Sequence, residues 1–188
     1  MQYRRLLPQQ IDAGFLDRFD RYQQVTRCWR KQDGQWRLLP IAFTEQWDEE
    51  ELRRTSLDLK RIAEDGAVFA AFPDGSNRPA AFAAVEGEPI GSRRQYLVLH
   101  YLYTDARFRS QGLGAHLMDL ALAYGRERKF EKLYISAHSS EESQRFYRRM
   151  GCVEAEEIDP HLYELEPCDC HLEIRTGYHA LSGADQKL

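Results

Sequence analysis

The pattern of hydrophobic and polar positions at the start of the chain predicts a short strand over residues 2–7. A helix is expected after Asp12, because aromatic side chains then recur near one helical face. These are Phe15, Phe19 and Tyr22. Residues 26–47 have no regular period, and the turn signal Gln32-Asp33-Gly34 indicates a loop that contains a hairpin.

The next segment predicts a helix that begins at Asp48 and ends at Gly66. Asp48 and Glu51 have the spacing of a capping box, and apolar residues follow at helical intervals. Two small apolar segments, residues 67–72 and 80–85, are separated by turn-forming residues, so we expect a hairpin.

Residues 95–104 are too continuously apolar to have one face in water, and we expect them at the centre of a sheet. The elements expected after them are a main helix, a strand, a short helix that Ser139 and Glu142 cap, and two strands. Their ranges are residues 112–129, 132–137, 140–151, 152–158 and 170–174. This order is not a regular βαβ alternation, so it predicts an α+β fold in a single domain, residues 1–188.

Composition favours a globular, cytoplasmic protein. Hydrophobic residues make up 43% of the chain and charged residues 30%, and no apolar run reaches the roughly 18 residues of a membrane span. The first residues include no apolar signal region, so we expect no secretory signal. The net charge of −4 is spread along the chain, which disfavours nucleic acid as a partner and leaves a homodimer open.

The four cysteines are expected to be free thiols, because a cytoplasmic chain keeps them reduced. They are Cys28, Cys152, Cys168 and Cys170. The sequence Cys168-Asp169-Cys170-His171 lacks the C-x₂-C spacing of structural zinc sites, so we expect no metal.

The loop between the central strand and the main helix carries the chemistry. It reads Arg109-Ser110-Gln111-Gly112-Leu113-Gly114-Ala115. Backbone N–H groups and the positive end of the helix dipole point outward there, the glycines allow an anion to approach, and Arg109 adds charge. We therefore expect this loop to bind a diphosphate-like ligand. The alternative is that the glycines only allow a tight turn between the strand and the helix. A Rossmann loop would need glycine at Leu117, and a Walker loop would need Lys after Gly114.

This R-x-x-G-x-G segment resembles the acetyl-CoA loop of the GCN5-related N-acetyltransferase (GNAT) superfamily. A second segment, residues 140–152, resembles that family's N-x-x-A-x-x-F-Y-x-x-x-G-F motif through Phe146, Tyr147 and Gly151. Ser140 and Ser143 replace the usual Asn and Ala, and Cys152 replaces the usual aromatic residue. The resemblance covers residues 67–174.

The resemblance implies a mixed, mostly antiparallel sheet of six to seven strands, splayed at its centre, with about four helices. Residues 67–174 would form the cofactor-binding core, and residues 1–66 the substrate side, whose pocket would lie around residues 15–47. The residues implied for acetyl-CoA are the loop, part of the second motif and the main chain of the central strand. They are Leu102, Tyr103, Thr104, Arg109, Ser110, Gln111, Gly112, Leu113, Gly114, Ala115, Ser140, Ser143 and Phe146.

Two catalytic residues are expected. The resemblance gives Tyr147 the role of the acid that protonates the departing thiolate. His100 interrupts an apolar strand near the reaction centre and is the candidate base, with Glu86 and His138 as alternatives. We do not expect an acyl-enzyme on Cys152, which would begin a buried strand.

The resulting hypothesis is direct transfer of an acetyl group from acetyl-CoA to the primary amine of a small molecule, in a ternary complex. Two other classes stay open at this point. A non-catalytic acyl-CoA sensor would bind the cofactor without turnover, and a scaffold protein would not bind it.

Overall fold

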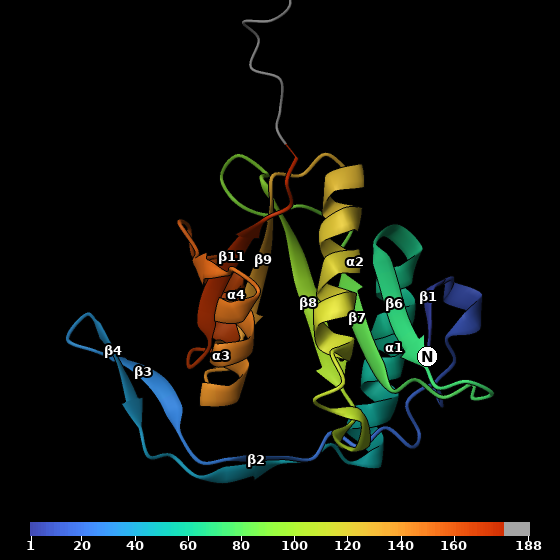
Figure 1. Cartoon of the computed structure of the whole chain (residues 1–188). Coiled ribbons are helices and arrows are strands. Elements are labelled where there is room, and N and C mark those ends of the chain that lie inside the picture. The colour runs from blue at the N-terminus through green and yellow to red at the C-terminus, as the bar shows by residue number, and fades with distance from the viewer. Residues whose placement is uncertain (179–188) are drawn as a thin grey trace, which may run out of the picture.

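The computed structural model describes residues 1–178, and its centre is a seven-stranded sheet in the order β1-β6-β7-β8-β9-β11-β10 (Figure 1). The strands of this sheet are β1 (Gln2–Leu6), β6 (Ala67–Phe72), β7 (Ala81–Val85), β8 (Tyr96–Thr104), β9 (Lys132–Ala137), β10 (Val153–Glu154) and β11 (Cys170–Arg175). Every neighbouring pair is antiparallel except β8 and β9, which are parallel. The continuously apolar strand β8 therefore lies in the middle of the sheet, as predicted.

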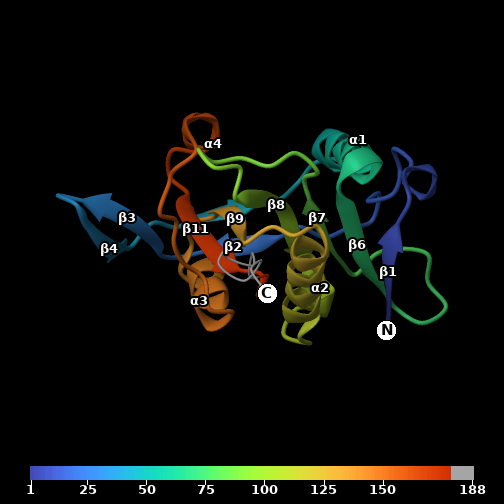
Figure 2. The ribbon, with the colours of Figure 1, turned by 90° about the horizontal axis from the view of Figure 1, so that it is seen from above.

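Helices cover both faces of this sheet. They are α1 (Glu49–Asp65), α2 (Leu113–Glu127), α3 (Glu141–Arg149) and α4 (Pro160–Leu165), with the 3₁₀ turns η1 (Pro8–Gln10) and η2 (Ala106–Phe108). Seen from above, α1 and α4 lie on one side of the sheet and α2 and α3 on the other (Figure 2). Each side has its own apolar core, one packed on α1 and one on α2. The expected α+β fold is confirmed. Among the helices of residues 1–178, none has the length and apolar character needed to cross a bilayer.

The capping box predicted for α1 is present. Asp48 accepts a hydrogen bond from the N–H of Glu51, and the carboxylate of Glu51 accepts one from the N–H of Asp48. The helix ends at Gly66, where an added Cβ would lie only 2.2 Å from the carbonyl oxygen of Val85. Glycine is required there because the chain turns directly against β7.

The segment between β1 and α1 contributes two small antiparallel pairs. β2 (Gln23–Val25) pairs with β5 (Phe43–Glu45), and β3 (Cys28–Gln32) pairs with β4 (Gln35–Leu39). Asp33 and Gly34 form the turn of the second pair with positive φ angles of 50° and 77°, which confirms the predicted hairpin. This hairpin extends away from the main sheet (Figure 1).

The prediction of a helix after Asp12 is wrong. A succession of turns replaces it, in which Phe15, Asp17 and Phe19 each bond to the carbonyl three residues earlier. The Asp12 side chain accepts the N–H of Gly14, which favours a turn over a helix.

The predicted strand over residues 152–158 is also mostly wrong, since β10 contains only Val153 and Glu154. The N–H of Glu156 is taken by the side chain of Glu173, and Asp159 then caps α4, a helix that the sequence analysis did not predict. The cap of α3 lies one residue later than expected, at Ser140.

A buried ionic cluster lies where β8 and β9 are paired. The ammonium group of Lys132, 2% exposed, is 2.7 Å from both Glu173 and Glu156. The hydroxyl of Tyr96, the residue opposite Lys132 on β8, donates to Glu173. Burial and the adjacent Glu173 raise the pKa of Tyr96 to about 12, so this hydroxyl stays protonated. The cluster links β8, β9 and β11 at one end.

Candidate active site

The parallel pairing of β8 and β9 ends partway along the strands. Residues 96–98 pair with residues 132–134, and the ladder stops at Val98 and Tyr134. On its other edge, β8 stays paired with β7 as far as Thr104. The sheet is therefore open at its centre beside the second half of β8, as the resemblance implies.

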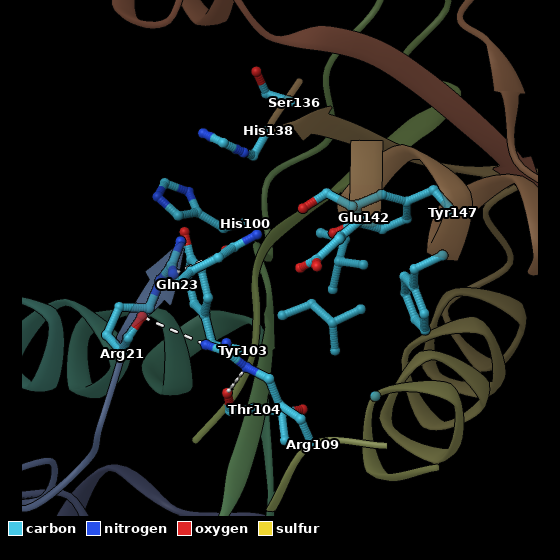
Figure 3. Close-up of a pocket in the computed structure, with 15 residues that line it drawn as sticks. Arg21, Gln23, His100, Tyr103, Thr104, Arg109, Ser136, His138, Glu142 and Tyr147 are labelled. Atoms are coloured by element: carbon cyan, nitrogen blue, oxygen red, sulfur yellow. Dashed lines mark hydrogen bonds between the residues drawn. The ribbon is translucent and has the colours of Figure 1, made fainter. Parts of the chain in front are cut away.

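A cavity of about 230 Å³ lies in this opening, and we call it the gap cavity. One wall is β8 and the opposite wall is formed by the end of β9 and by α3 (Figure 3). It brings together predicted residues from three separate parts of the sequence. These are His100, Leu102, Tyr103, Thr104, Arg109, Gly114, Ser143, Phe146 and Tyr147.

A second cavity of about 310 Å³, the loop cavity, lies at the start of α2. It is lined by five of the predicted loop residues besides Arg109, together with Thr104 and Phe146. These five are Ser110, Gly112, Leu113, Gly114 and Ala115. Thr104, Arg109, Gly114 and Phe146 line the gap cavity as well, so the two cavities adjoin. Gln111 is exposed and lines neither of them.

The loop backbone is shaped to receive an anion. Gly112 caps α2 with a φ of 79°, and Ser110 also has a positive φ of 62°. An added Cβ at Gly112 would meet nothing within 4 Å, so the loop is open in front of the helix. Among the described residues, no acceptor is found for the backbone N–H groups of residues 110–115. These unpaired donors and the helix dipole fit a phosphate group.

Arg109 adds positive charge between the loop and gap cavities. Its Nε donates to the carbonyl of Thr104 at 3.3 Å and its Nη2 to that of Arg21 at 3.5 Å. Within residues 1–178 it has no carboxylate at ion-pair distance. Burial and the charge of Arg21 lower the pKa of Arg109, although an arginine remains charged. Its positive charge is therefore free to meet an anionic ligand.

Helix α3 orients the second motif toward the gap. Ser140 is 2% exposed, and its Oγ accepts the N–H of Ser143 and contacts the Oγ of Ser143 at 2.9 Å. Its hydroxyl therefore serves the helix cap, and Ser140 lines neither cavity. Phe146 lies against Gly114, where an added Cβ would be 3.5 Å from its ring.

Tyr147 faces the gap cavity from α3 (Figure 3). Its ring packs edge-on against Phe146 with the centroids 5.2 Å apart. Among the described residues, its hydroxyl has no hydrogen-bond partner. Burial raises the pKa of Tyr147 well above its ordinary value, so the phenol remains protonated and available as a donor.

His100 lies at a β-bulge in the pairing of β8 with β7, between the residues that face Ala84 and Val85. Its Nδ1 is 2.9 Å from Glu86, and its Nε2 is 3.8 Å from Asp58. Burial alone would raise the pKa of Glu86, but hydrogen bonds from His100 and Arg61 outweigh it and lower this pKa to about 2. The candidate base and its alternative Glu86 are thus partners in one charged network.

A third cavity of about 580 Å³, the outer cavity, adjoins the gap cavity on the side of α4. Six residues line both: Arg21, Leu99, His100, Tyr103, Ser136 and His138. The Nδ1 of His138 accepts the N–H of Ser140, and its Nε2 contacts Glu45 at 3.1 Å. The hydrogen bond from His138 is the main reason why the pKa of Glu45 is lowered.

The polar residues of these cavities that the sequence analysis did not name include Arg21, Ser136 and Asp169. Arg21 is 3% exposed, forms an ion pair of 2.6 Å with Glu45, and lies 4.5 Å from the ring of Tyr103. Asp169 lines the outer cavity, and burial raises its pKa to about 6. Arg21 comes from the segment expected to shape the substrate pocket, but no local motif singles out any of the three.

Comparison with known proteins gives a family and a fold. Residues 32–152 match the model of the acetyltransferase (GNAT) family. The crystal structure of nourseothricin acetyltransferase superposes with a TM-score of 0.69 at 20% identity, covering 93% of this chain and 98% of that one. A Bacillus anthracis str. Ames protein, described as a streptothricin acetyltransferase and solved with acetyl coenzyme A, gives 0.65 at 12%, covering 93% and 96%.

The PaiA N-acetyltransferase of Thermoplasma acidophilum, solved with coenzyme A, gives a TM-score of 0.51 at 16% identity, with 68% of this chain and 73% of that chain covered. Among curated proteins, none matches this chain in sequence.

Proposed function

The chain belongs to the acetyltransferase (GNAT) family, and we propose that it transfers an acetyl group from acetyl-CoA directly to the primary amine of a small molecule. The observation that carries this proposal is the opening between β8 and β9. It joins a loop cavity suited to a diphosphate on one side to an outer cavity on the other, with Tyr147 between them.

The described residues fit acetyl-CoA. The unpaired N–H groups of residues 110–115 and the charge of Arg109 would hold the pyrophosphate. The edge of β8 that has no partner beyond Val98 would hold the pantetheine arm through the main chain of residues 102–104. When bound, acetyl-CoA supplies the activated acetyl group as a thioester.

The protein's own groups then act at the gap cavity. A backbone N–H of residues 102–104 would donate to the thioester oxygen as negative charge develops on it. The hydroxyl of Tyr147 would donate its proton to the sulfur as the thiolate departs. Because donor and acceptor sites adjoin, no acyl-enzyme is required. Burial raises the pKa of Cys152 to about 12, which makes its thiol a poor nucleophile.

The size and lining of the outer cavity support the proposal that the acceptor is a small molecule. Its volume of about 580 Å³ lies within the roughly 300–1,000 Å³ of small-molecule sites. Aromatic and apolar side chains form much of its wall and would contact the body of the acceptor. These are Trp47, Tyr101, Tyr103, Leu162 and Leu165.

The test is release of free thiol from acetyl-CoA with a panel of amines, followed by mass spectrometry of the product. The panel contains 2-phenylethylamine, spermidine, nourseothricin and a lysine-containing peptide. N-acetylation of a small amine supports the proposal. Acetylation of the peptide alone refutes the small-molecule acceptor, and CoA binding by calorimetry without any turnover indicates an acyl-CoA sensor instead.

A further inference from the structure

Asp169 lines the outer cavity beside Ser136, a residue that lines the gap cavity as well. It directly precedes β11, whose antiparallel register places Cys170 opposite Ala137 and His171 opposite Ser136 on β9. The hydroxyl of Ser136 donates to Oδ2 of Asp169 at 3.3 Å. Ser136 lines both cavities, while Asp169 lines the outer one. The carboxylate is therefore held beside the opening of the sheet.

The Asp169 carboxylate differs from the other partly buried carboxylates near this opening. Glu45 is paired with Arg21 and His138, and Glu86 is held by His100 and Arg61. Within the described part of the chain, the carboxylate of Asp169 has no cation at ion-pair distance, and the Ser136 hydroxyl is its one hydrogen-bond partner. A partly buried carboxylate that faces a cavity without a cation is suited to receive one from a ligand.

The histidines of the cavities are less free to act on a ligand. Each nitrogen of His100 lies within 4 Å of a carboxylate, from Glu86 or Asp58. His138 accepts a backbone N–H on one nitrogen and contacts Glu45 with the other. Among residues 1–178, His138 therefore has no nitrogen left for the amine of an acceptor, and the Nε2 of His100, which is not hydrogen-bonded, is directed at the carboxylate of Asp58.

We propose that Asp169 binds the ammonium group of the acceptor and accepts a proton from it, and so is the catalytic base of the acetyl transfer. This inference rests on the function proposed above. One ammonium proton moves to Asp169, which leaves a neutral amine with a free lone pair. As the new C–N bond forms and the C–S bond breaks, the nitrogen loses a second proton to water and Tyr147 protonates the sulfur. Asp169 then releases its proton to solvent, and Tyr147 regains one from solvent. One proton is released overall.

Burial is the main cause of the raised pKa of Asp169, about 6, so the carboxylate is ionised at neutral pH yet basic enough to take a proton. The nearby imidazole of His138 and the hydrogen bond from Ser136 lower the pKa of Asp169, and the carboxylates of Glu166 and Glu45 raise it. The titratable groups near Asp169 are His138 just after β9, Glu45 on β5, Glu166 after α4, Tyr103 on β8, Tyr147 on α3 and Cys170 on β11.

The test compares the pH dependence of kcat/KM in the parent, Asp169→Asn and Asp169→Glu, with Asp119→Asn as the matched control. Asp119 is exposed on α2 and lines none of the three cavities. We expect Asp169→Asn to lower kcat/KM at pH 7 by about 100-fold or more, with partial recovery at high pH, where the amine is already neutral. Asp169→Glu should retain more activity than Asp169→Asn, and the control should match the parent.

A rate within about threefold of the parent, with a profile of the same shape, would overturn the proposal. CoA affinity and thermal unfolding are measured on each variant, so that a folding defect is separated from a catalytic one. If the parent acetylates no amine, the proposed function fails, and binding of 2-phenylethylamine by calorimetry then decides on Asp169. Weaker binding to Asp169→Asn than to the parent supports it; equal binding, or no binding to the parent, overturns it.

Discussion

Replacing Tyr147 by phenylalanine removes one hydroxyl that faces the gap cavity and keeps the ring. The ring packs against Phe146 and the α2-side core, and those contacts persist in the variant. Since the hydroxyl has no hydrogen-bond partner among the described residues, we expect the free energy of unfolding to change by less than about 1 kcal/mol. The substitution therefore tests chemistry with little effect on the fold.

The size of the kinetic effect follows from the proton that Tyr147 would supply. Ordinary phenol and thiol pKa values of about 10 and 8.5 make this transfer uphill by roughly 2 kcal/mol. Burial raises the pKa of Tyr147, and it raises that of the nearby thiol of Cys152 to about 12. Burial in the same gap would also raise the pKa of the departing CoA thiol. Proton transfer from Tyr147 that is concerted with C–S cleavage therefore remains feasible. Losing such an acid costs about 10²–10⁴-fold, or about 3–5 kcal/mol.

The assay measures initial rates of thiol release at saturating acceptor and acetyl-CoA affinity by calorimetry. We expect the loss in kcat, with the affinity for acetyl-CoA within about twofold of the parent, because the proton is needed only as the thiolate departs. Tyr163→Phe is the matched control, since this tyrosine is 49% exposed and lines neither the gap nor the outer cavity. A kcat for Tyr147→Phe within about threefold of the parent would refute the acid role.

Four further substitutions test other parts of the structure. Gly112→Glu should weaken CoA binding more than tenfold in calorimetry, because its carboxylate would face the pyrophosphate, while thermal unfolding shows only the modest strain of a positive φ. His100→Ala should lower kcat/KM less than Asp169→Asn does, because both imidazole nitrogens face carboxylates; a larger loss with recovery at high pH would return the base role to His100. Lys132→Ala should cost about 3–5 kcal/mol in urea unfolding, because it leaves a buried carboxylate without its cation; a loss below about 1 kcal/mol would contradict this. The folded-state pKa of Glu86, about 2, lies below its ordinary value of 4.5, so the stability contributed by its ionised carboxylate is fully present above pH 4.5 and is lost as the pH falls through about 2. Glu86→Gln should remove this part of the pH dependence of the free energy of unfolding, which amounts to at most about 3 kcal/mol.

The elements that the sequence predicted well are those with local signals. The capping box at Asp48, the turn cluster between β6 and β7, and the apolar run of β8 each act within a few residues. The helix expected after Asp12 failed because aromatic spacing alone does not exclude a series of turns. Leu16 and Phe19 are buried against the α1 side of the sheet, and burial there gives the same apolar pattern.

The candidate site divides in the same way. The loop at Gly112 and the segment around Tyr147 are contiguous motifs, so their residues could be named from the sequence. Arg21 and Asp169 enter the cavities only through contacts distant in the chain, such as the ion pair with Glu45 and the pairing of β11 with β9. An isolated Asp between two cysteines has no pattern that marks it as a site residue.

The outer cavity takes part of its wall from short elements that lie outside the main sheet. Glu45 belongs to the two-stranded pair of β2 and β5, and Leu162 and Leu165 belong to α4, a helix of six residues. None of these three lines the loop cavity. If the proposed function holds, a mutant library restricted to these three residues should alter acceptor preference and leave the loop of residues 109–115 intact. On that proposal, the preference for an acceptor could be changed through these short elements without altering the seven-stranded sheet.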